Sequence, residues 1–182
     1  MIAKALSGIV LLAIILFLSC AYMVDETQRA ILLKFGEIKE ADIKPGLHWK
    51  VPVINDVKYF DSRILTLDVE PDLFSTSEKK YVYVDFFVKW RISNVLAYFV
   101  ATSGQEERAR SQLSQITKDE LRDEFALRTI KEAVSGERAD IMTNLVVKAN
   151  EKTTNDLGIE IVDLRVSRID YTDDISLSLI HI

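Results

Sequence analysis

The sequence of 182 residues contains few of the residue types from which most active sites are built. It has one cysteine and two histidines, which excludes an internal disulfide framework and a multi-cysteine zinc site and leaves little material for a histidine-rich metal centre. The HExxH, GxSxG, GxGxxG and phosphate-loop motifs are all absent. These absences argue against hydrolase, metalloprotease and nucleotide-binding functions, so we expect a non-enzymatic protein with no catalytic, cofactor-binding or metal-ligating residues.

An excess of positive charge is also lacking. The chain has 23 basic and 28 acidic residues and a net charge of −5, which argues against a nucleic-acid partner because phosphate binding needs basic side chains. With 48% hydrophobic residues, three prolines and six glycines, the chain is too apolar for a disordered protein. Its length fits one ordinary domain with an appendage.

Residues 5–24 contain no charge at all. A helix over this run spans about 30 Å at about 1.5 Å per residue, which matches the hydrocarbon thickness of a bilayer. Lys4 before the run also fits the start of a secretion signal. We predict an uncleaved transmembrane anchor over residues 1–24, and the alternatives are cleavage near Ala21 and lipidation of Cys20.

The charges that flank this run predict its orientation. Lys4 precedes it and Asp25 and Glu26 follow it, so the positive-inside rule places the N-terminus in the cytoplasm and the main domain outside, which in a bacterium is the periplasm. Beyond residue 24 the chain has 22 basic and 28 acidic residues, a net charge of −6. Such a body is not attracted to anionic headgroups, so it must contact a membrane through apolar side chains and the anchor.

Alternating apolar residues predict short strands in the first part of the body. In residues 28–35, Ile31, Leu33 and Phe35 share one face, and Gly36 ends the pattern. A polar stretch follows over residues 37–44, and Pro45 and Gly46 predict a turn. We expect a compact antiparallel meander of strands over residues 28–35, 47–51, 57–60 and 64–69.

The second part of the body combines a long strand with helices. Residues 81–92 keep a period of two over twelve residues and predict a strand with one core face. Helical spacing follows, and it predicts a short helix over residues 95–101 and one or two helices over residues 105–134. An amphipathic helix is predicted over residues 137–157, with Ser135 as N-cap and Gly158 as stop. Its buried face carries Met142, Leu145, Val146 and Ala149. The last strand, 159–166, changes its alternation near Val162 and predicts a bulge. We therefore expect an α+β fold with helices on one face of a sheet.

Isolated residues with possible chemistry have simpler structural interpretations. His48 and His181 are expected to be structural or surface residues, and Cys20 an apolar filler. Acid pairs such as Asp119 and Glu120 on the predicted helices are expected on solvated faces. Trp90 falls on the core face of its strand, and Trp49, between Leu47 and Val51, is a candidate for the membrane interface.

Several segments, read in order, resemble the SPFH group of stomatin, prohibitin, flotillin, HflK and HflC. Residues 25–36 after a single N-terminal span, and then residues 44–54, look like the opening of that group. Residues 158–166 resemble the strand that closes its domain. The segments that are similar to the HflC branch are residues 61–63, 76–80, 84–93 and 98–102.

The resemblance implies a membrane scaffold without catalytic residues. Similar proteins alternate with an HflK-like subunit in a large assembly on the periplasmic face of the bacterial inner membrane, and this assembly surrounds and modulates the ATP-dependent membrane protease FtsH. Residues 5–24 would anchor the chain, residues 45–54 would lie near membrane lipids, residues 25–170 would form the SPFH domain, and its helices would contact neighbouring subunits. The alternative is a stomatin-like organiser of membrane microdomains without a protease partner.

The end of the chain departs from the family pattern. Similar proteins continue from the last strand into a long charged helix, whereas residues 171–182 begin where that helix would start and end in an apolar stretch without the expected Glu, Arg and Ala. A truncated, a frameshifted and a naturally short chain all fit this pattern. We expect a chain of this length to sediment as a small species, because it lacks the helix that would build the wall of the assembly.

Overall fold

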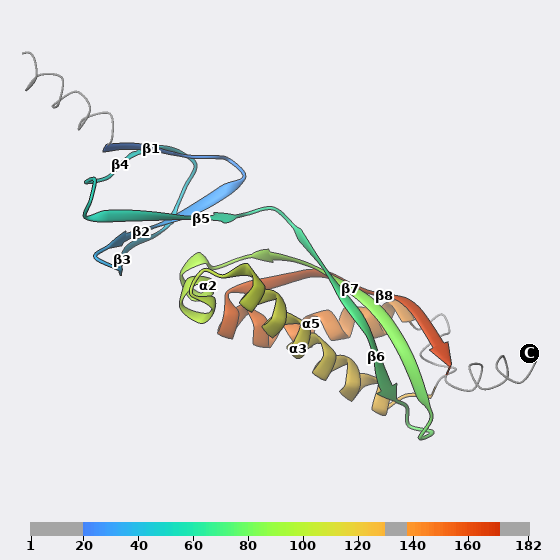
Figure 1. Cartoon of the computed structure of the whole chain (residues 1–182). Coiled ribbons are helices and arrows are strands. Elements are labelled where there is room, and N and C mark those ends of the chain that lie inside the picture. Colours follow the sequence, from blue (N-terminus) through green and yellow to red (C-terminus); the bar gives the residue numbers. More distant parts are fainter. Residues whose placement is uncertain (1–19, 130–137, 172–182) are drawn as a thin grey trace, which may run out of the picture. The chain divides into compact units, whose positions relative to one another are not determined.

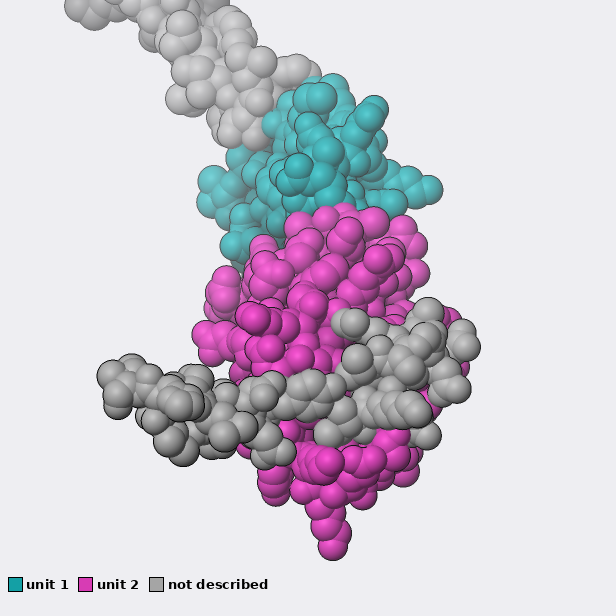
Figure 2. Space-filling model, turned by 90° about the vertical axis from the view of Figure 1, so that its right-hand side faces the viewer, with its two compact units in different colours: residues 1–63 teal, residues 64–182 magenta. Residues whose placement is uncertain are grey.

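A computed structural model describes residues 20–129 and 138–171. The chain divides into two compact units, residues 1–63 (unit 1) and residues 64–182 (unit 2), which Figure 2 shows in teal and magenta. Several predictions concern residues outside these two stretches: most of the anchor, the N-cap Ser135, the surface residue His181, and nearly all of the segment 171–182.

Unit 1 consists of five short strands in two antiparallel sheets (Figure 1). Strands β3, β2 and β5 form one sheet in that order, and β1 pairs with β4 in a two-stranded ribbon. The strands are β1 (Ala21–Val24), β2 (Gln28–Lys34), β3 (Glu37–Ile43), β4 (Gly46–Trp49) and β5 (Asn55–Asp61).

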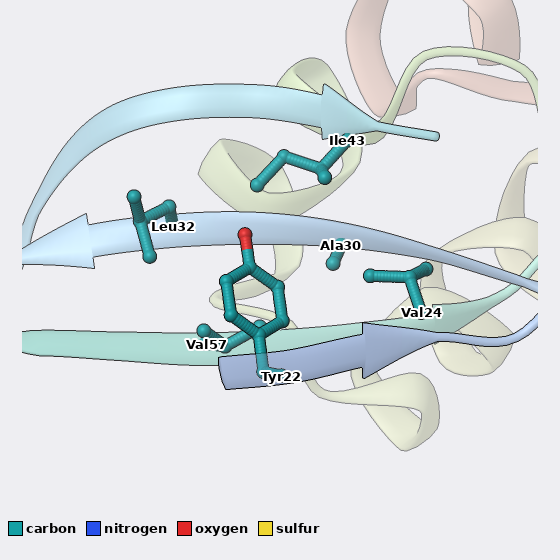
Figure 3. Packing of buried hydrophobic residues seen from close by; sticks show 6 residues of the cluster. All are labelled: Tyr22, Val24, Ala30, Leu32, Ile43 and Val57. Carbon is teal, nitrogen blue, oxygen red and sulfur yellow. The ribbon is translucent and has the colours of Figure 1, made fainter. Parts of the chain in front are cut away.

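The core of unit 1 is a cluster of six side chains from four strands (Figure 3). These are Tyr22, Val24, Ala30, Leu32, Ile43 and Val57, none more than 8% exposed. They meet because alternate residues of a strand point to the same face, so Tyr22 and Val24 of β1 reach the same interior as Ala30 and Leu32 of β2. Unit 1 therefore has a small hydrophobic core of its own.

The predicted end of the transmembrane anchor is wrong. The anchor was expected to run to Val24, but Ala21–Val24 form strand β1, and Val24 is almost fully buried in the core. An uninterrupted apolar run cannot by itself distinguish a membrane helix from a buried strand that follows it. Within residues 20–129 and 138–171, no helix is both long and apolar enough to cross a membrane.

Two further expectations for unit 1 need correction. Phe35 was expected in the strand, on one face with Ile31 and Leu33, but β2 ends at Lys34, and Phe35 and Gly36 form the tight turn to β3 with φ of 52° and 86°. The polar stretch after Gly36 was not expected to pair, yet it forms β3. As an edge strand, β3 can expose its charged side chains, so it carries little of the apolar alternation used for prediction.

Unit 2 is an antiparallel sheet of three strands with helices packed on it (Figure 1). The strand order is β6, β7, β8, so β7 lies in the centre, and α5 packs chiefly against β8 while α3 contacts α5 and β6. The elements are β6 (Leu65–Ser75), β7 (Tyr81–Ile92), α2 (Val95–Thr102), α3 (Glu106–Ala126), α5 (Arg138–Leu157) and β8 (Ile159–Tyr171). This arrangement confirms the α+β class, but β6 does not join the strands of unit 1 in one meander.

The central strand β7 has the predicted bounds and the predicted core face. Its alternate residues Val82, Val84, Phe86, Val88 and Trp90 are at most 1% exposed. The opposite face carries Tyr81 and Tyr83, both exposed, and the half-buried Phe87. A strand with this strict alternation has one buried face and one accessible face.

The predicted bulge in the last strand is confirmed. Lys89 pairs with Asp163 and Trp90 pairs with Ile161, so Val162 is the extra residue and its side chain is exposed. A second shift in register, between Arg168 and Val166, was not predicted. The strand also continues to Tyr171, five residues beyond its predicted end.

The buried face of α5 differs in part from the prediction. Leu145 and Ala149 are buried as expected, but Ile141, Thr153 and Leu157 complete the stripe, and Met142 and Val146 are only half-buried. A spacing of four residues from Ile141 to Leu157 follows one row along the helix. Apolar residues at neighbouring positions made the exact row ambiguous in the sequence.

Charged side chains join α3 to α5. Glu124 accepts hydrogen bonds from Lys148 at 3.1 Å and from Arg128, and Glu120 accepts one from Lys152. Glu120 and Glu124 are only 8% and 5% exposed, so the expectation that Glu120 lies on a solvated face is wrong. A carboxylate can be buried in this position because lysines from the adjacent helix reach over it.

Candidate functional site

The β1–β4 ribbon of unit 1 has one buried face and one exposed apolar face. Met23 pairs with Leu47 and Ala21 pairs with Trp49, while Tyr22 pairs with His48 on the opposite face. Because β1 directs Tyr22 and Val24 into the core, Met23 must point outwards, and Leu47 and Trp49 point outwards with it. Met23, Leu47 and Trp49 are 73%, 65% and 57% exposed.

The exposed apolar side chains continue into two neighbouring turns. Val51 and Val53 lie in the loop between β4 and β5, and Phe35 lies in the turn between β2 and β3. Phe35 is 78% exposed and Val53 is fully exposed. We call these residues together the apolar surface of unit 1, which consists of Met23, Phe35, Leu47, Trp49, Val51 and Val53.

Backbone hydrogen bonds hold these turns beside the start of the described chain. The Lys50 N–H donates to the Cys20 carbonyl at 2.7 Å, and the Phe35 N–H donates to the Ile54 carbonyl at 3.2 Å. The Asn55 N–H closes the loop by donating to the Val51 carbonyl at 3.0 Å. The apolar surface therefore adjoins Cys20, the residue that follows the apolar run of residues 5–19.

Val53 adopts a backbone conformation that its side chain disfavours. Its φ is 76°, in the left-handed region that β-branched residues rarely occupy, and such a residue costs about 1–3 kcal/mol. Burial in the domain does not compensate for this strain, because the side chain is fully exposed. A strained residue that is also exposed and apolar points to a contact outside the domain.

The described part of unit 1 carries no net charge. Over residues 20–63 there are seven basic and seven acidic side chains. Arg29 pairs with Asp42 at 3.1 Å, and Arg63 donates to Asp61 at 2.6 Å, which lowers the pKa of the Asp61 carboxyl. The apolar surface is thus not surrounded by a strong field of either sign, and attraction to it would rest on apolar contact.

The histidine and the two tryptophans considered for chemistry occupy structural or surface positions. One nitrogen of the His48 ring, Nε2, lies 2.8 Å from the Lys44 carbonyl, and the ring lies 5.5 Å from that of Tyr22. Trp90 is fully buried in the core of unit 2, as predicted, and Trp49 is exposed on the ribbon. In the two described stretches, no three His, Cys, Asp or Glu side chains gather to hold a metal ion.

Sequence reasoning found only part of the apolar surface. Trp49 was a candidate for the membrane interface, and the family resemblance implied that residues 45–54 lie near the membrane, but Met23 was assigned to the anchor and Phe35 to a strand. The run Val51, Pro52, Val53 and Ile54 was the available signal, because consecutive apolar residues around a strand-breaking proline cannot all be placed in a sheet core.

Comparison with known proteins gives one family and several relatives. Residues 22–179 match the SPFH domain / Band 7 family. The chain is 39% identical over 170 residues to Protein HflC of Haemophilus influenzae, covering 88% of this chain and 58% of the relative. It is 32% identical over 212 residues to Protein HflC of Vibrio parahaemolyticus, covering 97% and 65%.

A relative from Escherichia coli K12 is named "Modulator of FtsH protease HflC" and is 29% identical over 218 residues, covering 95% of this chain and 65% of the relative. That name describes a modulator of a protease and not an enzyme, which supports the non-enzymatic reading of the sequence. The chain spans about three-fifths of the length of these curated relatives. The family match covers both units, and the chain belongs to the SPFH domain / Band 7 family.

Proposed function

We propose that this chain is an HflC-like scaffold of the bacterial inner membrane that modulates an FtsH-like protease together with an HflK-like subunit. The observation that carries the proposal is the apolar surface of unit 1 beside Cys20. An uncharged run of residues 5–19 leads directly into a domain that exposes six large apolar side chains near the junction. Both features suit a protein whose first unit rests on lipid.

The magnitude of apolar burial supports contact with lipid. Moving one large apolar side chain out of water contributes about 1.5–3 kcal/mol when burial is complete. Trp49 also has an indole N–H, and tryptophan is enriched at the level of the headgroups. Several such side chains around one anchored junction are enough to hold unit 1 against the bilayer, even though residues 20–63 have no net charge.

The proposed topology follows from the charges around the N-terminal run. Lys4 lies before it and the acidic Asp25 and Glu26 follow it, so the main domain would be periplasmic. Strand β1 shortens the span available for a membrane helix to residues 5–20 at most. A hydrophobic helix of that length can be accommodated when the adjoining domain lies at the interface, as the apolar surface of unit 1 would allow.

The protease and the second subunit are proposed from the relatives. The E. coli relative is named as a modulator of FtsH, and the family resemblance adds an HflK-like partner. The test is to express the full chain in a bacterium that contains both proteins, solubilise the membranes in mild detergent, and isolate the chain by a C-terminal tag. We expect both partners to co-purify, and recovery of neither would overturn the proposal.

A second arm of this experiment separates the scaffold from a stomatin-like organiser. In cells without the HflK-like protein, the proposed scaffold should lose the protease from the purified complex. If the protease were still recovered at the same level, the HflK-like subunit would not be needed. A chain that stays in the membrane fraction but never recovers the protease would support the stomatin-like alternative.

A further inference from the structure

The sheet of unit 2 ends in two edge strands, β6 and β8. The outer side of an edge strand presents N–H and C=O groups that can pair with a strand of another molecule. A scaffold that assembles many subunits at a membrane would be exposed to such pairing at high local concentration. Each edge of this sheet carries a feature that opposes such pairing.

The side chain of Asn150 occupies the outer side of β8. Its Nδ2 donates to the Ile161 carbonyl at 2.9 Å, and its Oδ1 accepts from the Ile161 N–H at 2.6 Å. A side-chain amide that both donates to and accepts from one residue reproduces the pairing that a neighbouring strand would make. Asn150 lies on α5, which packs along β8, so the helix brings this amide to the edge.

Irregular backbone at both edge strands also opposes the addition of another strand. In β8 the extra residue Val162 follows Ile161 directly, and bulges interrupt the regular ladder that a new strand would need. In β6 the register shifts between Val69 and Asp72, and Pro71 within that interval has no N–H to donate. In β8 the Thr154 hydroxyl of α5 also donates to the Ile159 carbonyl at 3.3 Å, but Asn150 is the side chain that pairs with both the N–H and the C=O of one residue.

We propose that Asn150 is a guard residue that keeps the β8 edge from accepting an extended strand of a second copy of this chain. The inference rests on the proposed scaffold function in one respect, because it specifies that subunits meet through the faces of the domain and not by extending the sheet. Removing the amide would leave the Ile161 N–H and C=O available. The partner that fits this opened edge is the β8 edge of another copy.

The experiment compares Asn150→Ala with Asn155→Ala in the full chain in detergent. Asn155 is the matched control, because it lies on the same helix but donates only to the Glu151 carbonyl of that helix, at 2.8 Å. We expect Asn150→Ala to speed hydrogen exchange of the Ile161 amide and to raise the self-association constant about tenfold in sedimentation velocity, since two backbone groups become available to a partner. Asn155→Ala should change neither quantity.

A second substitution separates edge pairing from general unfolding. Val162→Lys places a charge at the exposed bulge beside Ile161, and charged residues on an edge block strand addition. Added to Asn150→Ala, it should return self-association to the parent level. If Asn150→Ala does not fold, Asn150→Asp keeps the acceptor for the Ile161 N–H and opens only the carbonyl, so association should rise by less than tenfold.

Three results would overturn the guard role. They are unchanged exchange at Ile161 in Asn150→Ala, faster exchange without stronger self-association, and self-association that persists after Val162→Lys. None of these measurements involves the protease or the HflK-like subunit. Failure of the guard role would therefore leave the recovery of those partners as a separate test of the proposed function.

Discussion

Unit 1 and unit 2 use their apolar side chains differently. Unit 1 has a small core and leaves Met23, Phe35 and Val53 largely exposed, with a net charge of +1 from eight basic and seven acidic residues. Unit 2 buries the apolar face of β7 under helices and has a net charge of −6 from 15 basic and 21 acidic residues. Unit 2 also exposes apolar side chains, such as Val100 and Leu127, so the proposed function rests on the gathering of such side chains around the β1–β4 ribbon of unit 1 and not on their number.

The largest expected effect tests how tightly unit 2 is packed. A Cβ on Gly158 would lie 2.3 Å from the Asn94 carbonyl oxygen and 2.8 Å from the Tyr98 nitrogen, and the residue has a φ of 64°. We expect Gly158→Ala to lower the free energy of unfolding by about 3 kcal/mol or more, because strain and a backbone clash add together. Urea unfolding on a Trp49→Phe background, followed by Trp90 fluorescence, measures it.

The matched control is Gly36→Ala in unit 1. Gly36 also has a positive φ, 86°, but a Cβ there meets no atom within 4 Å. Only the conformational penalty of a positive φ remains, so hydrogen exchange in β2 should report a free energy of unfolding that is lower by about 1 kcal/mol. Equal losses for the two glycines would contradict the tight packing of Gly158 against the start of α2.

The next effect concerns the buried carboxylate between α3 and α5. Burial acts to raise the pKa of Glu124, but hydrogen bonds from Arg128 and Lys148 outweigh it and lower the pKa below its ordinary value. Glu124→Gln should lower the free energy of unfolding by about 1–3 kcal/mol at pH 7. The decrease is smaller than the loss of a wholly buried ion pair would cause, because the Lys148 side chain is 56% exposed. Urea unfolding at several pH values checks this.

The pH dependence has a definite sign. A carboxyl whose pKa is lower in the folded state stabilises the protein above its unfolded pKa of about 4.3, and this contribution is lost as the pH falls through the folded pKa. The difference in the free energy of unfolding between the parent and Glu124→Gln should therefore disappear below about pH 4. Glu106→Gln is the control, because its exposed pair with Arg110 contributes less than about 0.5 kcal/mol; a gap independent of pH would refute the role of charge.

A smaller effect separates stability from membrane contact in unit 1. Val53→Gly should relieve the strain at φ 76° and raise the stability of unit 1 by about 1 kcal/mol, after allowing for the greater freedom of glycine in the unfolded chain. The same change removes an exposed apolar side chain, so the variant should bind vesicles more weakly. Hydrogen exchange and flotation with vesicles measure the two changes, and a parallel gain in both would contradict our interpretation of Val53.

The smallest effect compares two buried threonines in unit 2. Within the described residues the Thr153 hydroxyl has no hydrogen-bond partner, whereas the Thr117 hydroxyl donates to the Leu113 carbonyl at 2.7 Å. Thr153→Val should raise the free energy of unfolding by up to about 1 kcal/mol, because it removes an unpaired buried hydroxyl without changing the shape much. Thr117→Val should give no gain in urea unfolding, and an equal gain at both positions would argue against this reason.

The sequence predicted unit 2 better than unit 1. The alternation from Tyr81 to Ile92 gave the bounds of β7, and the change of alternation at Val162 gave the bulge, because a sheet with one buried face leaves a regular pattern. In unit 1 the strands are four to seven residues long, and β3 is a polar edge. Short strands and edges leave too few alternating positions for the pattern to be recognised.

The candidate site was predicted in part for a related reason. The pattern along the chain assigned Met23 to the membrane helix and Phe35 to the end of a strand, since an apolar side chain in a sequence does not show whether it is buried or exposed. Only the pairing of β1 with β4 shows that Met23, Leu47 and Trp49 share an outward face. The pairs of Glu120 with Lys152 and of Glu124 with Lys148 likewise join residues of two different helices, 32 and 24 positions apart in the chain.

The central claim is that the apolar surface of unit 1 lies in lipid, and the fluorescence of Trp49 tests it most directly. The chain has only two tryptophans, and Trp90 is fully buried in unit 2. The full chain would be reconstituted into vesicles with plain acyl chains and into vesicles with brominated ones, which quench nearby indoles. We predict that brominated lipid quenches the emission and that Trp49→Phe abolishes this quenching; equal emission of the parent in both kinds of vesicle would contradict the claim.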